Sequence, residues 1–292
     1  MDVNILNVGA IMDAYQKVTD RIVQALEDGV IPWRKPWAGG LSPNNPVTGS
    51  VYTGINTVLL GCEKQADPRW TTFKGAVSKG YSVKGCKGKG VPVVFWKMNR
   101  YKSKDKVTGE EELKTFPFMR TYTVFNYEDL GGTPDLVVEA RDQVALHSEA
   151  QTIIDNSGAD VRHGGSQAYY RPSEDYIQLP PREAFDSTSA YYGTALHEMA
   201  HWTGADGRVE RNLKGGFGSE EYAREELRAE IASAFTCSRY QLERVDDTAS
   251  YLASWLRKLK EDKHEIVRAS TDAKKIAEYL VQYAEARAEA AG

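Results

Sequence analysis

Residues 189–203 read SAYYGTALHEMAHWT, and the second half of the chain is interpreted outward from this stretch. It contains one glycine and no proline, so it is predicted to be helical. Within it, His197, Glu198 and His201 form an H-E-x-x-H pattern. Residues four apart share one face of a helix, so both imidazoles can reach one metal ion while Glu198 serves as a general base. The plainer alternative is a pair of ordinary helical histidines. Because the chain has only five histidines, this pattern would rarely arise by chance.

A catalytic zinc site of this kind needs a third protein ligand. The metzincin pattern would place a histidine at position 207, where this chain has Gly207, and Asp206 is off that register by one residue. Downstream, Glu226 and Glu230 lie four residues apart in a strongly helical stretch. This spacing favours a gluzincin arrangement, with Glu226 as the ligand and Glu230 as the residue that orients a ligand histidine. Two alternatives stay open: Glu230 is the ligand, or both are solvated helix carboxylates.

A tyrosine could assist such a site by donating a hydrogen bond to the oxyanion that develops during peptide hydrolysis. Tyr192 precedes His197 by more than one helical turn and is the candidate for this role, with Tyr191, Tyr169 and Tyr170 also within plausible reach. The simpler interpretation is that most of the 16 tyrosines pack in the core or at its rim. Zn²⁺ is the expected metal, with Mn²⁺ as an alternative.

The net charge of −4 conceals an asymmetry along the chain. Residues 1–140 contain 18 Lys and Arg against 15 Asp and Glu, a net of +3, whereas residues 141–292 contain the remaining 19 and 26, a net of −7. Residues 69–106 contain 11 basic residues and one acid, Asp105. Clustering of this kind indicates contact with a polyanion.

The same basic stretch interleaves cations with aromatic rings, a combination that binds single-stranded DNA by stacking on bases and following phosphates. The segment IPWRKPW at residues 31–37 repeats the combination upstream. The candidate DNA contacts are Trp33, Arg34, Lys35, Trp37, Trp70, Lys74, Lys79, Lys84, Lys87, Lys89, Trp96, Lys97 and Arg100. The alternative is that the rings are core and the lysines a solvated face. No helix-turn-helix or zinc-finger pattern is present, so sequence-specific recognition of duplex DNA is not indicated.

Hydrophobic spacing predicts an α+β fold in two domains, residues 1–133 and 134–292, divided near the turn-rich GGTPD at 131–135. The first is expected to combine an amphipathic helix at 10–28 with a small antiparallel sheet. Its strands are predicted at 81–83, 91–98 and 115–125. The second is expected to be mainly helical, with short strands between residues 159 and 179 and helices at 139–156, 183–204, 219–244 and 247–288.

The chain shows no signal for export or membrane insertion. Its first residues, MDVNILNVGA, lack a basic region followed by an apolar core, and its apolar runs are far shorter than a membrane helix. Cys62, Cys86 and Cys237 are widely separated and follow no metal-ligand spacing. We therefore expect a cytoplasmic protein with reduced thiols and no membrane partner.

Long strings in both halves carry a family resemblance. In the first half they are YQKVTDRIVQALEDGVIPWRKPW, NPVTGSVYTGINTVLL, WTTFKGAVSKGYSVKGCKGKG, VVFWK and FNYEDLGG. In the second they are GGSQAYYRPSEDYIQLP, FDSTSAYYGTALHEMAHWTG and YAREELRAEIASAF. Together they resemble the ArdC family of antirestriction proteins, carried by conjugative plasmids and phages. The resemblance implies an N-terminal single-stranded DNA-binding domain and a C-terminal zincin-like metallopeptidase domain.

The family pattern falls on His197, Glu198, His201 and the pair Glu226 and Glu230, while Asp206 stands near a turn where many relatives are expected to have a histidine. The implied role is protection of incoming plasmid DNA from host restriction, with an active peptidase that antirestriction need not require. Two other functions stay open: a DNA-coating protein with a silent metal site, and a regulatory or DNA–protein-crosslink protease. The expected partners are single-stranded DNA and either a host restriction enzyme or another protein substrate.

Overall fold

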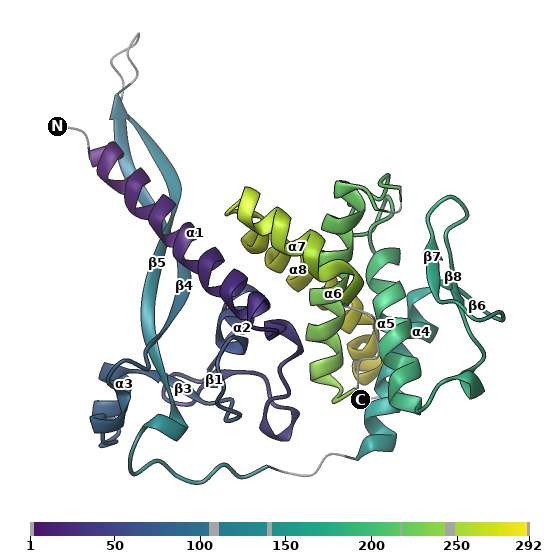
Figure 1. Cartoon of the computed structure of the whole chain (residues 1–292), viewed down its shortest axis with the longest axis horizontal. Coiled ribbons are helices and arrows are strands. Elements are labelled where there is room, and N and C mark those ends of the chain that lie inside the picture. The colour runs from purple at the N-terminus through teal and green to yellow at the C-terminus, as the bar shows by residue number, and fades with distance from the viewer. Residues whose placement is uncertain (1–2, 105–110, 139–141, 217, 243–248, 291–292) are drawn as a thin grey trace.

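The computed structural model describes residues 3–104, 111–138, 142–216, 218–242 and 249–290, with all of their side chains but those of residues 3–13, 97–104, 111–118, 249–250 and 286–290. Its two halves lie side by side (Figure 1). The predicted α+β class is confirmed.

The first half is built on a long, twisted hairpin. Its helices are α1 (Val3–Glu27), α2 (Ile55–Gly61) and α3 (Phe73–Ser78), and its strands are β1 (Asn44–Asn45), β2 (Ser50–Val51), β3 (Trp70–Thr72), β4 (Val91–Lys104) and β5 (Glu111–Asn126). Strands β4 and β5 form the hairpin, in register from Val91 opposite Val124 to Lys104 opposite Glu111. β3 joins the other edge of β5, so the sheet has the order β3-β5-β4 and is antiparallel throughout.

The strand predicted at 81–83 is wrong, because only a single bridge between Ser82 and Gly131 forms there. Gly80, at φ 76°, turns the chain just before it, and a 3-10 helix at Lys84–Cys86 follows it directly. The third strand of the sheet is instead β3.

The second half is mainly helical, as predicted. Its helices are α4 (Gln143–Ser157), α5 (Thr188–Trp202), α6 (Glu220–Arg239), α7 (Ala249–Glu261) and α8 (Glu265–Ala290), and its strands are β6 (Asp160–His163), β7 (Tyr169–Arg171) and β8 (Tyr176–Leu179). The small sheet has the order β6-β8-β7, with β6 parallel and β7 antiparallel to β8. Among the described residues, no helix combines the length and hydropathy needed to cross a bilayer.

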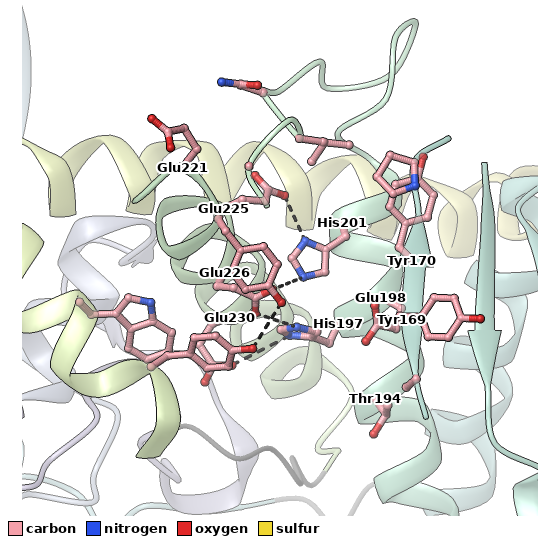
Figure 2. Close-up of a pocket in the computed structure, with 18 residues that line it drawn as sticks. Tyr169, Tyr170, Thr194, His197, Glu198, His201, Glu221, Glu225, Glu226 and Glu230 are labelled. Carbon is pink, nitrogen blue, oxygen red and sulfur yellow. Dashed lines mark hydrogen bonds and ion pairs between the residues drawn. The ribbon is translucent and has the colours of Figure 1, made fainter. Parts of the chain in front are cut away.

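Serine caps fix where the two central helices begin. The Ser187 hydroxyl accepts a hydrogen bond from the Ala190 amide at the start of α5, and the Ser219 hydroxyl does the same for the Tyr222 amide at the start of α6. The two helices then pack directly against each other. Their contact brings the H-E-x-x-H turn of α5 next to the first half of α6 (Figure 2).

One hydrophobic core spans both halves. It includes Val18, Ile22 and Leu26 of α1 together with the inner faces of α5, α6 and α8. The segment at Pro32–Arg34 forms a 3-10 helix, η1, that packs on both α2 and α6. It can do so because Gly61 ends α2 without a side chain: a Cβ there would lie 1.9 Å from the Pro32 carbonyl oxygen. The division at residue 133 stays a prediction.

Candidate metal centre

Helices α5 and α6 bring three potential metal ligands together. His197, His201 and Glu226 each offer one ligand atom, and these atoms lie within 4.8 Å of one another. The Glu226 carboxylate lies 3.7 Å from His197 Nε2 and 3.4 Å from His201 Nε2 (Figure 2). Burial alone would raise the pKa of Glu226, but hydrogen bonds from both histidines hold it below the usual range. Two imidazole nitrogens and a carboxylate oxygen are a donor set that fits a divalent ion with an open position.

His201 is oriented by Glu225, which was not among the predicted site residues. His201 Nδ1 lies 3.2 Å from a Glu225 carboxylate oxygen. Arg211 holds this carboxylate with its Nε at 3.0 Å and its Nη2 at 2.7 Å, and it also donates to the Ala200 carbonyl and the Thr203 hydroxyl. Glu225 therefore has the role that was predicted for Glu230 with respect to His201.

Glu230 lies at the other histidine and faces the first half of the chain. One carboxylate oxygen lies 4.0 Å from His197 Nδ1. The other accepts a hydrogen bond from Arg34 Nε at 2.8 Å and lies 3.4 Å from Trp33 Nε1. The alternative of Glu230 as a ligand is not supported, because Glu226, and not Glu230, groups with the two histidines among the described residues.

Glu198 lies on the opposite side of His197 from Glu226, next to β7 (Figure 2). Its side chain is buried, and burial raises its pKa above the usual range for a carboxyl. The neighbouring backbone of Tyr170 opposes this rise and lowers the pKa of Glu198. A buried carboxyl with a raised pKa beside two histidines can both accept and return a proton near neutral pH.

The centre opens into a cavity of about 580 Å³. Residues of strand β7 and helices α5 and α6 line it, together with Tyr251 and Trp255 of α7. Among the residues that the structure describes, five glutamates line the cavity and no lysine or arginine does. A cavity of this size, lined by both acidic and aromatic side chains, can hold a few residues of a peptide.

The predicted role of Tyr192 is wrong. Its side chain is buried, its hydroxyl donates to Gln151 at 3.2 Å, and it does not line the cavity. Tyr222, which was not predicted, does line it, one helical turn before Glu226. Its hydroxyl lies 3.3 Å from that of Tyr251, and burial raises its pKa, so it keeps its proton. The four-residue spacing from Glu226 was the available sequence signal.

Three of the predicted DNA contacts belong to the interior, and two more are partly buried. Trp33, Trp37 and Trp70 are 5%, 7% and 0% exposed, so their rings pack in the core and cannot stack on bases. Arg34 is bound to Glu230 of the second half. Lys35 is half-buried and donates to the Glu63 carbonyl.

The other predicted contacts are six residues with described side chains and two whose side chains are not described. Five lysines are exposed, Lys74, Lys79, Lys84, Lys87 and Lys89, although Lys89 also pairs with Asp129 at 2.7 Å. Trp96 is 48% exposed and packs one face near Tyr15, with ring centroids 6.0 Å apart. Lys97 and Arg100 lie in β4, and their side chains are outside the described residues.

The sheet also presents a ring pair that was not among the predicted contacts. Phe95 and Tyr122, each 45% exposed, meet edge to face with centroids 5.4 Å apart. Side chains alternate along a strand, so this pair lies on the face opposite Val94, which is in the shared core. Exposed rings of this kind on a sheet are a suitable stacking platform.

Each half of the chain matches a known protein family. Residues 12–125 match the N-terminal domain of the anti-restriction factor ArdC, and residues 148–272 match a zincin-like metallopeptidase domain. Over 92% of its length the chain is 39% identical to a DNA primase TraC of Escherichia coli, of which it spans only 27%. It is 36% identical to the uncharacterized protein y4eC of Sinorhizobium fredii (strain NBRC 101917 / NGR234), covering 92% of this chain and 91% of that protein. It therefore spans about a quarter of the primase and almost all of the second relative.

Two crystal structures of the antirestriction protein ArdC from plasmid R388 are similar over nearly the whole chain. The metal-free structure has a TM-score of 0.76 at 38% identity, covering 94% of this chain and 98% of that one. The Mn(II)-bound structure has a TM-score of 0.73 at 36% identity, covering 92% and 97%. With matches to both halves and to a complete relative, the chain belongs to the ArdC family of antirestriction proteins.

Proposed function

We propose that this protein is a divalent-metal peptidase of the antirestriction type. The observation that carries the proposal is the convergence of His197, His201 and Glu226, whose ligand atoms lie within 4.8 Å of one another. The Mn(II)-bound structure of the R388 ArdC protein adds support, because it belongs to a relative that is alike over almost the whole chain. Zn²⁺ suits two imidazoles and a carboxylate, and Mn²⁺ is the alternative.

In this proposal, Glu198, Tyr222 and Glu225 each have a separate role in peptide hydrolysis. When bound, the ion would polarise the scissile carbonyl as a Lewis acid. Glu198 takes a proton from the attacking water and passes it to the leaving amine. Tyr222 donates its hydroxyl hydrogen to the developing oxyanion, a role in which one donor contributes about 10²–10³-fold in rate. Glu225 keeps His201 in the tautomer with its proton on Nδ1, so that Nε2 faces the ion.

An extended peptide is the substrate that the cavity wall favours. β7 is the edge strand of its sheet, pairing with β8 in the described part of the chain, and Tyr169 and Tyr170 line the cavity. A peptide can pair with such an edge through main-chain hydrogen bonds and present its scissile bond to Glu198.

The test compares the wild type with Glu198→Gln, which keeps the size of the side chain but removes the base. Both would be loaded with Zn²⁺ or Mn²⁺ and incubated with unfolded protein and with a restriction enzyme. We expect cleavage by the wild type, a loss of about 10²–10⁴-fold in the variant, and equal metal content in both. Absence of cleavage by the fully loaded wild type with every substrate would favour a DNA-coating protein with a silent site.

We further propose that the first half binds single-stranded DNA without sequence preference. The exposed Phe95–Tyr122 pair supports base stacking, and the exposed lysines of α3 and the following loop support phosphate contact. In this role the protein would cover plasmid DNA in the recipient cytoplasm and protect it from host restriction.

The DNA-binding test is a titration of labelled single strands and duplex at several salt concentrations. The wild type is expected to prefer single strands, and Tyr122→Ala is expected to lose about 1–3 kcal/mol of binding, while Tyr122→Trp keeps the ring and the affinity. Equal affinity of Tyr122→Ala and wild type would remove the ring pair from the interface. If the Glu198→Gln variant still protects plasmid DNA in cells, protection does not depend on proteolysis. If the wild type cleaves only proteins that are crosslinked to DNA, the crosslink-protease alternative is supported.

A further inference from the structure

The two histidines of the metal centre are supported by different halves of the chain. His201 is held by Glu225 and Arg211, which both belong to the second half. His197 is approached by Glu230, whose other carboxylate oxygen is bound by Arg34. Glu230 is 3% exposed, so its charge depends on a partner inside the protein, and the guanidinium of Arg34 supplies it from the first half.

Trp33 makes a second connection between the halves at the same place. Its Nε1 lies 3.4 Å from the Glu230 carboxylate, and its ring meets that of Trp255 edge to face with centroids 5.7 Å apart. Trp255 lines the metal cavity and stacks on Tyr251, which contacts the hydroxyl of Tyr222. Trp33 therefore supports both Glu230 and the aromatic residues Trp255 and Tyr251 that line the cavity.

The segment that carries these two residues has a well-defined position. Pro32 starts the 3-10 helix η1, which packs on both α2 and α6. The absence of a side chain at Gly61 lets η1 lie directly on α2. A side chain held in this way from a neighbouring rigid element can set the position of a carboxylate to within a fraction of an ångström.

We propose that Arg34 and Trp33 are positioning residues for the metal centre, acting through Glu230 on His197. This rests on the proposed metal site. The guanidinium holds the Glu230 carboxylate 4.0 Å from His197 Nδ1, and the negative charge at this distance favours a proton on that nitrogen, which leaves Nε2 to bind an ion. The second half thus has a complete metal centre only when η1 of the first half is in place. Removing Arg34 takes away the guanidinium that holds the buried Glu230 carboxylate in this position.

The test measures the affinity for Mn²⁺ and Zn²⁺ by calorimetry in the full-length protein. We expect Arg34→Gln to weaken binding about 10–100-fold, the range for residues that orient metal ligands, and Arg34→Lys to recover part of it. Gln241→Ala is the matched control. It removes another hydrogen bond between the halves, from Gln241 to the Gly39 carbonyl, and leaves the Arg34–Glu230 pair in place, so its affinity is expected to stay unchanged.

A double-mutant cycle separates positioning from general destabilisation. If Arg34 acts through Glu230, Arg34→Gln adds little to the affinity lost in Glu230→Gln. Equal metal affinity of wild type and Arg34→Gln, or fully additive losses, would overturn the inference. If Arg34→Gln does not fold, Arg34→Lys and Trp33→Phe are measured in its place, and metal affinities equal to that of the wild type, or losses fully additive with Glu230→Gln, would again overturn the inference. A wild type that binds no metal would instead refute the proposed metal site, which is a different result.

Discussion

His201 Nδ1 lies 3.2 Å from a carboxylate oxygen of Glu225, the residue directly before the proposed ligand Glu226. Adjacent residues on a helix point about 100° apart, so α6 presents two carboxylates to two different nitrogens of one imidazole. Glu226 faces Nε2 at 3.4 Å and Glu225 faces Nδ1. Arg211 fixes the second of these contacts by holding both oxygens of Glu225.

Glu225→Gln is therefore expected to weaken metal binding about 10–100-fold without removing a ligand. The amide accepts a weaker hydrogen bond from His201 and loses the charge that Arg211 holds. Calorimetric titration with Zn²⁺ measures the effect, and Glu221→Gln, an exposed glutamate of the same cavity, is the control. Identical affinities of Glu225→Gln and wild type would show that Glu225 does not orient the histidine.

Metal binding is expected to stabilise the folded chain. A ligand that binds only the native state adds about 2.7 kcal/mol to the free energy of unfolding when its concentration is 100 times its dissociation constant. Thermal unfolding in Zn²⁺ or Mn²⁺, compared with unfolding in a chelator, should show a higher midpoint with the metal. His201→Ala, which removes a ligand, should show no such difference. A shift of the same size in that variant would mean that the ion binds elsewhere.

The affinity for single-stranded DNA should depend on the exposed lysines through the salt concentration. Each phosphate contact contributes about 0.7 to the slope of log affinity against log salt concentration. Replacing both Lys84 and Lys87 by alanine is expected to reduce the slope by about 1.4. Lys214→Ala, at an exposed position in the acidic half, is the control. A slope equal to that of the wild type would place the DNA on another surface.

Gly61→Ala is expected to destabilise the fold, because its Cβ would lie 1.9 Å from the Pro32 carbonyl oxygen. Backbone has to move to relieve this overlap, at a cost of about 1–3 kcal/mol or more. The free energy of unfolding in urea gives the measurement. Gly216→Ala, where a Cβ would meet nothing within 4 Å, should unfold like the wild type. A Gly61→Ala variant of wild-type stability would show that η1 does not depend on this close contact.

The metal-binding helix of the second half could be predicted from sequence, but the contacts that residues distant in the sequence make with its histidines could not. The features that predict α5 lie within the helix itself, so the helix and its two histidines follow from the sequence. Whether Glu225 or Glu230 faces His201 depends on the rotation of α6 about its axis, which packing determines. Arg34 lies 196 residues before Glu230, and no spacing rule connects them.

The aromatic residues of the first half show the limit of composition. Trp33, Trp37 and Trp70 occur beside cations in the sequence, as stacking rings do, yet all three are buried. Tyr122, by contrast, is exposed beside Phe95 because the register of β4 and β5 places both on the outer face. Composition identifies the kind of chemistry, but only the register of the sheet decides which rings meet solvent.

The most direct test of the metal centre is a crystal structure of the chain grown with Zn²⁺ or Mn²⁺, with anomalous diffraction to locate the ion. The ion is expected to be bound by Nε2 of His197, Nε2 of His201 and the carboxylate of Glu226, with Glu225 on His201 Nδ1 and Glu230 still bound to Arg34. An ion coordinated by Glu230 in place of Glu226, or an absence of any anomalous peak between α5 and α6 at saturating metal, would contradict the account.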